Sequence, residues 1–457
     1  MIDIIIISPR THHFSVTPPL GVGYLLSALK KAGYSSAFIH MDKYGLDEDK
    51  VSDIVRHSNP AFIGFSIVTQ GFVSAKKIMD TLKPKTLGIK TVIGGPHVTS
   101  EPGESLRLLG ADMALIGEAE ESLVRLLDYY LKGDKESENI DGLVRDINSD
   151  KKDVFMPIIE DLDSLDFPDW ETLKPSSYPP RPHQMLVKRF PVAPLITSRG
   201  CVYNCSFCAV PDLSKHRFRK RNPENVVSEI KMLVEKYNVK EIQFEDDSFT
   251  YNKDHAVAVC EAIISLNSGV IWSLPNGIRP DSVDPELLGI MKRAGCYQIG
   301  LGIESGNERV MKNVRKQISR EDCFRAVRMI KNAGIESRGF YVLGLPGENR
   351  ESVKDTVKLA MMLDTDYMSL GICSHIPGSS INRALTEKTD YDYASISYFG
   401  RARGDKSIGK KYYLYFIIKY YSRFKHTVNV IKRIKIRQVL ILLKAFSRLL
   451  KYSLFGA

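Results

Sequence analysis

The chain has 457 residues, of which 43% are hydrophobic, and a chain of this size predicts two domains that each bury a sizeable core. Its net charge of +10 is concentrated at one end, because the residues from Arg401 onward include fifteen Lys or Arg and one acid, Asp405, which leaves the first 400 residues at −4. The sequence contains no apolar run of about eighteen residues, which argues against a transmembrane helix, and its apolar start, residues 1–7, lacks the basic region of a signal peptide.

Residues 1–130 alternate short apolar strands with helical patterns. Such alternation predicts a doubly wound parallel sheet of the Rossmann-like kind, whose ligands bind beyond the carboxyl ends of the strands. Glycine pairs at those ends let the main chain approach a large flat ligand closely. The predicted strands are 4–8, 36–40, 61–66, 90–93 and 113–116, and the predicted helices are 20–32, 47–57, 73–82, 104–109 and 120–130. The residues that follow the predicted strands include Ser66, Thr69, Gly94, Gly95, His97 and Glu118.

Residues 131–190 form a predicted connector. The segment 132–139 is polar, 161–170 and 175–182 are rich in turn residues and proline, and one short strand is expected within 140–146. An extended segment that contacts both domains fits this composition better than a third fold.

Residues 191–390 return to alternating strands and helices. Six strands are two short of a full (β/α)8 barrel, so this domain is predicted to be a partial TIM-like barrel. The expected strands are 195–197, 241–244, 271–274, 298–301, 339–343 and 367–372.

Three cysteines, Cys201, Cys205 and Cys208, lie in one loop directly after the first of these strands. Thiolates favour iron–sulfur clusters and zinc. A structural zinc site needs four ligands, and the nearest further candidate, His216, stands alone. A cubane cluster held by three Cys would instead leave one iron open. The alternatives are a zinc knuckle or three buried structural thiols. The other cysteines, Cys260, Cys296, Cys323 and Cys373, lack ligand spacing and are expected to be small buried hydrophobes.

Polar side chains follow the later barrel strands. Their carboxylates and amides can accept hydrogen bonds from an ammonium group or ribose hydroxyls of a bound cofactor. Any single one is weak evidence, but their order along the chain is informative. They are Asp246 and Asp247, Asn276 and Arg279, Glu304 and Ser305, Gly344 in a Gly-Leu-Pro-Gly-Glu turn, and His375 in a His-Ile-Pro-Gly-Ser loop.

The tail, residues 391–457, contains two predicted basic amphipathic helices, 410–425 and 428–454. Basic helices rich in aromatic residues can lie on anionic membrane surfaces. The alternative is that they pack back on the barrel or cap its active site. Nucleic acid is not an expected partner, because no recognised binding module accompanies the charge.

The cysteine loop, with Phe207 before the third Cys and Ser198-Arg199-Gly200 before the first, resembles the signature of the radical S-adenosylmethionine (SAM) enzymes. In that family three Cys hold a [4Fe–4S] cluster whose open iron chelates SAM, and one electron cleaves SAM to a 5′-deoxyadenosyl radical. The resemblance implies cluster ligation by Cys201, Cys205 and Cys208. It also implies a SAM side formed by Phe207, Asp246, Asp247, Asn276, Arg279, Glu304, Ser305, Gly344 and His375.

The N-terminal half resembles the cobalamin-binding domain of one large subgroup, which includes the anaerobic Mg-protoporphyrin monomethyl ester cyclase and the hopanoid and lipid C-methylases. The matches are 18–21, 94–97 and 117–120. The chain lacks the DxHxxG motif, so no His ligand to cobalt is expected. A domain that keeps the fold without the corrin is the alternative. The residues implied on the cobalamin side are Ser66, Thr69, Gly94, Gly95, His97 and Glu118.

These resemblances imply a cobalamin-dependent radical methyltransferase that acts on an unactivated carbon, with chemistry supplied by the cofactors. One alternative is an oxidative cyclase acting on a tetrapyrrole without methyl transfer, and another is a non-enzymatic corrin carrier that needs only residues 1–130. Methylthiotransferases are disfavoured because no Cys precedes Cys201, and relatives with auxiliary clusters because none follows Cys373. No catalytic acid or base is predicted.

Partners and location follow from the same reasoning. The expected partners are a small-molecule substrate, with the tail's composition hinting at a lipid or tetrapyrrole, and an external electron donor such as flavodoxin or ferredoxin. The expected location is the cytoplasm, with peripheral contact at the inner face of the membrane.

Overall fold

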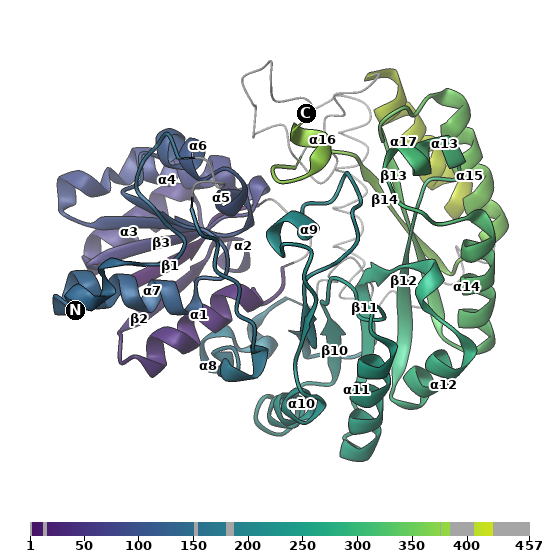
Figure 1. The fold of residues 1–457 in the computed structure, drawn as a ribbon, viewed down its shortest axis with the longest axis horizontal. Helices are drawn as coiled ribbons and strands as arrows, with labels where there is room; N and C mark the ends of the chain where they lie inside the picture. Colours follow the sequence, from purple (N-terminus) through teal and green to yellow (C-terminus); the bar gives the residue numbers. More distant parts are fainter. Residues whose placement is uncertain are drawn as a thin grey trace.

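The structure is a computed structural model that describes residues 2–11, 16–149, 154–179, 187–374, 376–383 and 406–423. These residues form two α/β units side by side, with the N-terminal unit in purple and blue and the C-terminal unit in teal and green (Figure 1). The first is an open sheet between helices, and the second is a curved sheet with helices along its outer side. The predicted fold class, a doubly wound sheet followed by a partial barrel, is confirmed.

The N-terminal sheet has the order β2-β1-β3-β4-β5-β6, with β1 to β5 parallel and β6 antiparallel at the edge. In this doubly wound order the chain reverses direction across the sheet between β1 and β3, where ligands of such folds bind. The strands are β1 (Ile4–Ser8), β2 (Ser36–His40), β3 (Phe62–Ser66), β4 (Lys90–Gly94), β5 (Met113–Leu115) and β6 (Leu143–Val144).

Alternation along β1 explains how both faces of this sheet are buried. Ile4 and Ile6 pack under the helices of one face, and Ile5 and Ile7 pack under the helices of the other. One face carries α1 (Leu20–Lys31) and α7 (Glu120–Leu127), and the opposite face carries α3 (Glu48–Ser58), α4 (Phe72–Leu82) and α6 (Pro102–Leu109). Two shorter helices, α2 (Met41–Tyr44) and α5 (Pro96–Ser100), follow β2 and β4.

The second sheet has six parallel strands in the order β14-β13-β12-β11-β10-β7, as predicted. The first strand lies slightly earlier than the sequence suggested, because residues 196 and 197 already belong to the turn into the cysteine loop. The strands are β7 (Val192–Leu195), β10 (Glu241–Phe244), β11 (Ile271–Ile278), β12 (Cys296–Glu304), β13 (Glu336–Leu343) and β14 (Tyr367–Ile372). The helices are α10 (Pro223–Tyr237), α11 (Lys253–Leu266), α12 (Pro285–Arg293), α13 (Glu308–Asn313), α14 (Arg320–Asn332) and α15 (Arg350–Leu363).

Three short elements complete the part of the barrel that positions the site. A two-stranded hairpin, β8 (Ser198–Arg199) with β9 (Arg219–Lys220), flanks the cysteine loop, and α9 (Val210–Leu213) lies within it. Helix α16 (Ser380–Arg383) follows the last strand.

The connector contacts both units. Trp170, in the short helix α8 (Trp170–Leu173), donates its indole N–H to Glu229 of α10 at 2.8 Å, and Asp169 N donates to Gly23 O of α1 at 3.0 Å. The connector therefore ties α1 to the outer layer of the barrel.

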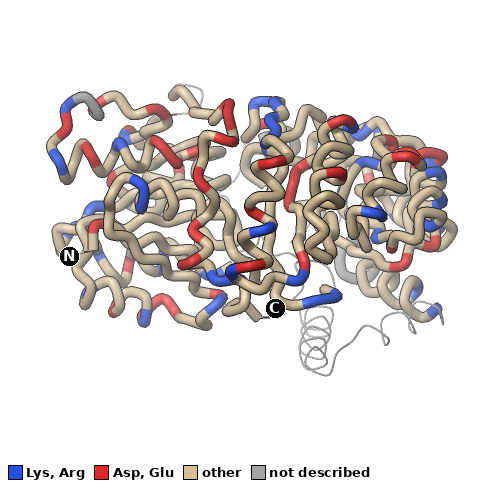
Figure 2. Tube along the Cα trace, turned by 90° about the horizontal axis from the view of Figure 1, so that it is seen from below, with Lys and Arg blue, Asp and Glu red and all other residues tan. Residues whose placement is uncertain are grey.

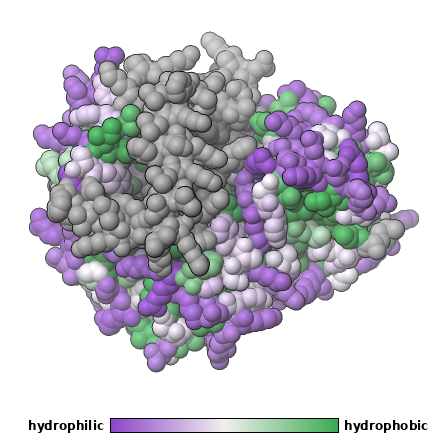
Figure 3. Space-filling view, turned by 180° about the vertical axis from the view of Figure 1, so that it is seen from behind, coloured by the Kyte–Doolittle hydropathy of each residue, from purple (hydrophilic) through white to green (hydrophobic). Residues whose placement is uncertain are grey.

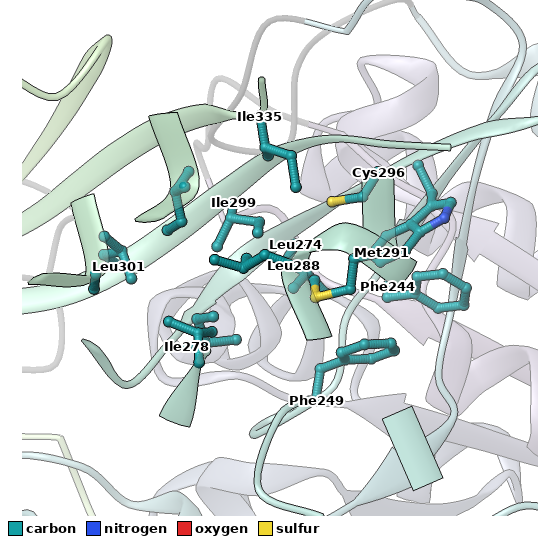
Figure 4. Close-up of a cluster of buried hydrophobic side chains, with 14 of the residues drawn as sticks. Phe244, Phe249, Leu274, Ile278, Leu288, Met291, Cys296, Ile299, Leu301 and Ile335 are labelled. Carbon is teal, nitrogen blue, oxygen red and sulfur yellow. The ribbon is translucent and has the colours of Figure 1, made fainter. Parts of the chain in front are cut away.

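Aromatic and aliphatic side chains fill the space between the barrel strands and their helices (Figure 4). Phe244, Phe249 and Trp272 form a cluster of rings with centroids 5.1–5.5 Å apart. Cys296 lies among these apolar groups beside Met291. Cys260, Cys323 and Cys373 are also buried, as predicted for thiols that serve as small hydrophobes.

The described part of the tail is helix α17 (Lys406–Tyr421) with the two residues after it, and α17 packs beside α15 against β13 and β14. Tyr413, Phe416 and Tyr420 are buried in the barrel core, and the Tyr421 hydroxyl donates to Met368 O at 3.0 Å. Of the two fates considered for the first tail helix, packing on the barrel is the one observed. The second predicted helix, 428–454, lies outside the described residues.

Replacing Tyr420 with Phe tests this packing. The Tyr420 hydroxyl lies 2.7 Å from Thr365 Oγ1 and is buried, so its loss should lower the free energy of unfolding by about 1 kcal/mol. Thermal unfolding of the full chain measures the effect. Tyr415→Phe is the matched control, because Tyr415 lies on the same helix and is 45% exposed, and it should leave the unfolding temperature unchanged.

Charged residues of both signs are interspersed over both units (Figure 2). Hydrophilic side chains predominate among those coloured on the face shown in Figure 3, with hydrophobic ones in small groups. Within the described residues, no helix combines the length and apolar character needed to cross a bilayer.

Candidate active site between the two domains

The entry to the cysteine loop is held by a buried carboxylate. Asp246, at the end of β10, accepts hydrogen bonds from Thr197 N at 3.1 Å, Thr197 Oγ1 at 2.7 Å and Ser198 Oγ at 2.6 Å. Burial raises the pKa of Asp246. Because its oxygens are already taken by the protein, we expect Asp246 to shape the loop rather than contact a cofactor.

Gly200, which directly precedes Cys201, is held just as tightly. Gly200 has φ +93°, and a Cβ there would overlap the carbonyl oxygen of Arg217, so only glycine fits. Gly200 N donates to Asp247 Oδ2 at 3.0 Å. Burial raises the pKa of Asp247 to about 6. Unlike Asp246, Asp247 lines a cavity, so it stays available to a ligand.

The three predicted cluster ligands come together in this loop. Cys201, Cys205 and Cys208 are half-buried free thiols, and they lie close together, because the charge of Cys205 acts on both Cys201 and Cys208. Burial raises all three pKa values, that of Cys208 to about 12, so the thiols would stay protonated until metal binds.

The donor set fits a [4Fe–4S] cluster. In the described part of the chain, no three His, Cys, Asp or Glu side chains are arranged around a single metal ion. In a cubane each Cys ligates a different iron, so its thiolates need not converge on one point as zinc ligands must.

A buried ion pair lies beside the cysteine loop. Lys316 Nζ is 2.6 Å from Glu304 Oε1, and both side chains are less than a tenth exposed. Glu304 has φ +62°, an uncommon conformation for a residue with a side chain, and follows a bulge in β12. Burial raises the pKa of Cys205, but the charge of Lys316 counteracts this. Lys316 was not predicted, since a single lysine after a short helix carries no sequence signal.

Arg279 supplies a second cation at this loop. Its guanidinium lies 4.0 Å from the ring centroid of Tyr203, between the first two cysteines, and 2.6 Å from Asp281 Oδ2. Burial alone would lower the pKa of Arg279, but the hydrogen bond and charge of Asp281 outweigh it and raise the pKa. Asn276 is exposed, and its Nδ2 donates to Glu245 O at 2.8 Å.

The remaining predicted SAM-side residues lie at the ends of β12 and β13 or beside them. Ser305 is buried, with Oγ 3.1 Å from Thr356 Oγ1. Phe207 packs against the small apolar cluster that contains Leu345. Gly344 N donates to the carboxylate of Glu348, whose pKa burial raises to about 7. His375 lies outside the described residues.

A cavity of about 460 Å³ lies between the two units. Its wall on the barrel side includes Arg199 and Gly200, at the start of the cluster loop, and Asp247, which follows β10. Its N-terminal side is the sheet face under α1 and α7, with an apolar floor formed by Ile4, Ile6, Gly64, Val92 and Leu115.

Four of the six predicted cobalamin-side residues line this cavity, namely Ser66, Gly94, Gly95 and Glu118. A Cβ on Gly95 would lie 2.8 Å from the main chain of Ile67, so the two loops meet closely. Thr69 and His97 are buried instead, with His97 Nδ1 3.2 Å from Thr69 Oγ1. Burial lowers the pKa of His97 to about 3, so its ring is neutral and supports the loop.

Four charges meet at the boundary of the units and line the cavity. Glu118 accepts two hydrogen bonds from Arg219, at 2.7 and 2.8 Å, and Glu120 accepts one from Arg199 at 2.9 Å. Only Glu118 was predicted as a site residue. Its partners are about 80 and 100 residues away along the chain, beyond the reach of local pattern analysis.

Comparison with known proteins agrees with this geometry. The model described as "Radical SAM superfamily" matches residues 195–360, and the model described as "B12 binding domain" matches residues 11–127. The chain is 30% identical to the uncharacterized methyltransferase PH0819 of Pyrococcus horikoshii, over 80% of this chain and 77% of that protein. The chain belongs to the cobalamin-binding radical SAM enzymes, in the family of this methyltransferase.

Other relatives show the breadth of this group. The anaerobic magnesium-protoporphyrin IX monomethyl ester cyclase of Rubrivivax gelatinosus is 27% identical, over 83% of this chain and 69% of its own. The radical SAM methyltransferase TsrM of Kitasatospora setae, solved with cobalamin and a [4Fe–4S] cluster, shares the fold, with a TM-score of 0.68 at 19% identity, and the match covers 85% of this chain and 78% of TsrM.

The cofactors of the chain are those of its family, a [4Fe–4S] cluster, SAM and cobalamin, and the similarity to the Pyrococcus methyltransferase supports a radical SAM methyltransferase. A second TsrM structure contains tryptophan, which is a small-molecule substrate of that enzyme. The cysteine loop and the cavity are the parts of the chain that fit these groups.

Proposed function

We propose that this enzyme transfers a methyl group to an unactivated carbon of a small molecule bound between its two domains. The observation that carries the proposal is the cavity wall on the barrel side. Arg199 and Gly200 line the cavity directly before Cys201 in the chain, and Asp247 lines it beside them, accepting from Gly200 N at 3.0 Å. When bound, the cluster with SAM supplies a 5′-deoxyadenosyl radical, and cobalamin supplies the methyl group. The protein's own task is to hold both reacting groups at one cleft and to exclude water.

On the SAM side, Cys201, Cys205 and Cys208 would hold the cluster. Lys316 and Arg279 lie close enough to Cys205 for their positive charges to oppose the rise that burial causes in its pKa, and these two cations would bind the carboxylate of SAM. Carboxylates bind lysine and arginine through charge-assisted hydrogen bonds. Further contacts would come from Asp247, Asn276, Ser305 and Gly344, and from Phe207 as an apolar wall.

On the cobalamin side, the loops that carry Ser66, Gly94 and Gly95 would approach the corrin with main chain, and the apolar floor would receive one arm of the ligand. A cavity of this size suits a drug-sized group, so it would hold only part of a corrinoid. His97 is enclosed in the protein, and His40 Nδ1 accepts from Lys43 N at 3.3 Å at the start of α2. We therefore infer that neither His40 nor His97 is a ligand to cobalt.

The alternative function is cyclisation of a tetrapyrrole without methyl transfer, which the similarity to the cyclase supports. Anaerobic turnover with methyl-deuterated SAM discriminates the two. We expect the product mass to increase by one labelled methyl group per turnover. A product that forms at the same rate without the label would remove methyl transfer and favour the cyclase reaction.

Two partners follow from the same proposal. Reductive cleavage of SAM consumes an electron, and the remaining cysteines are single and buried, so we propose an external donor such as flavodoxin or ferredoxin. The basic segment after residue 423 supports peripheral contact with an anionic membrane and a lipid or tetrapyrrole substrate. Because α17 packs on the barrel, we assign the proposed membrane contact to the residues that follow it.

A further inference from the structure

The charges at the domain boundary form a continuous network rather than separate ion pairs. Glu118 accepts hydrogen bonds from Nη1 and Nη2 of Arg219 and from Ile159 N of the connector, the last at 2.7 Å. It also lies 3.4 Å from Arg199 Nη1. Arg199 Nη2 in turn donates a hydrogen bond to Glu120 Oε1 at 2.9 Å. Burial alone would raise the pKa of Glu118, but the hydrogen bonds of Arg219 and the charge of Arg199 lower it, so the carboxylate stays ionised.

Arg199 occupies an unusual position in this network. It belongs to the barrel, two residues before Cys201, yet its side chain is held by the N-terminal domain. Its guanidinium lies 4.8 Å from the ring centroid of Tyr24 on α1 and is 15% exposed. Arg199, which lies just before the cluster cysteines, is therefore held by the domain that forms the floor of the cavity.

The same residues face the cavity. Tyr24, Glu118, Glu120, Arg199 and Arg219 all line it. A ligand in the cavity would exclude water from the network, and ion pairs strengthen when water is excluded. A cluster bound to Cys201 would fix the main chain that carries Arg199. Cobalamin would therefore order the charge network from the cavity, and the cluster would order it through the main chain of Arg199. Because each cofactor would order residues that the other also contacts or depends on, the condition for positive coupling is met.

We propose that Arg199, held by Glu118 and Glu120, is a positioning residue through which cobalamin binding and cluster binding stabilise each other. This inference rests on the cofactors of the proposed function but concerns their order and mutual dependence. Because coupling between two sites is reciprocal, the cluster should tighten cobalamin binding by the same factor by which cobalamin tightens the cluster. Couplings of this kind amount to about 5- to 150-fold, and we expect about tenfold here.

The test measures binding of aquacobalamin to the full-length chain under anaerobic conditions, by absorbance titration, with the cluster reconstituted and with the iron removed. The ratio of the two dissociation constants should be about ten. In a second measurement, the rate at which a chelator extracts iron should fall when aquacobalamin is present. In Arg199→Gln, and in Glu120→Gln, both cofactors should still bind, but the ratio should fall to near one.

Controls separate coupling from general damage to the fold. Glu171→Gln removes the ion pair of Lys30 on α1, whose side chains are 64% and 66% exposed, and should keep the tenfold ratio. Arg199→Lys keeps the positive charge but lacks the planar guanidinium group, so it should retain part of the coupling that Arg199→Gln loses. If Arg199→Gln does not fold, Glu120→Gln, which preserves shape, decides the question.

The outcomes are distinguishable. A ratio of one in the wild-type chain, or a ratio of ten retained in the folded Arg199→Gln or Glu120→Gln chain, overturns the coupling and leaves the proposed function intact. A chain that binds no aquacobalamin, or assembles no cluster, overturns the proposed function itself.

Discussion

Replacing Cys205 with Ala is expected to reduce the iron content of the anaerobically reconstituted protein to near zero and to abolish cleavage of SAM. Two thiols cannot hold a cubane and leave one iron for SAM, so no residual radical chemistry should be measurable by release of 5′-deoxyadenosine. Aquacobalamin should still bind, more weakly by about the tenfold factor expected from coupling to the cluster.

The matched control is Cys260→Ala. Cys260 is fully buried in the barrel core, so its loss should cost about 1 kcal/mol of stability while leaving iron content and SAM cleavage unchanged. If Cys205→Ala retained a full cluster, or if the wild-type loop took up zinc in place of iron, the assignment of Cys201, Cys205 and Cys208 would be wrong.

Replacing Lys316 with Met is expected to give the largest loss of stability. The substitution leaves the Glu304 carboxylate buried without its cation, which typically costs about 3–5 kcal/mol. Tryptophan fluorescence during urea unfolding follows the loss of the barrel core, because Trp272 of β11 and Trp170 of the connector, the two tryptophans of the chain, are both buried in it. The affinity for SAM should fall as well, since Lys316 is one of the two cations proposed near its carboxylate.

The double variant Lys316→Met, Glu304→Gln provides the control. It removes both charges, so most of the lost stability should return while SAM binding stays weak. A single variant as stable as the wild-type protein would show that the ion pair is not required by the fold, and unchanged SAM affinity would remove Lys316 from the site.

Local patterns were sufficient to predict the fold and the cluster loop. The strands are short apolar runs such as Ile4–Ser8, in which consecutive apolar residues indicate burial on both faces of the sheet. The three cysteines lie within eight positions of one another. The main error in strand placement, at residues 195–197, arose because the apolar run continues into the turn that Asp246 holds.

Sequence patterns could not assign roles to individual polar residues. Asp246 and Asp247 are adjacent and chemically identical, but one is enclosed by Thr197 and Ser198 and the other lines the cavity. The difference depends on which way the chain turns after β10. Arg199 likewise matched the family signature, but its partners Glu118 and Glu120 come from another domain, so its position became clear only once the two domains were placed together.

The packing of α17 has a practical consequence for protein engineering. Among the described strands, β14 lies at the edge of its sheet, and a chain cut before residue 406 would expose the apolar surface now covered by Phe416 and Tyr420 next to that edge. Bare edges of this kind promote aggregation. Anyone wishing to delete the basic terminus for better solubility should therefore place the stop codon after residue 423.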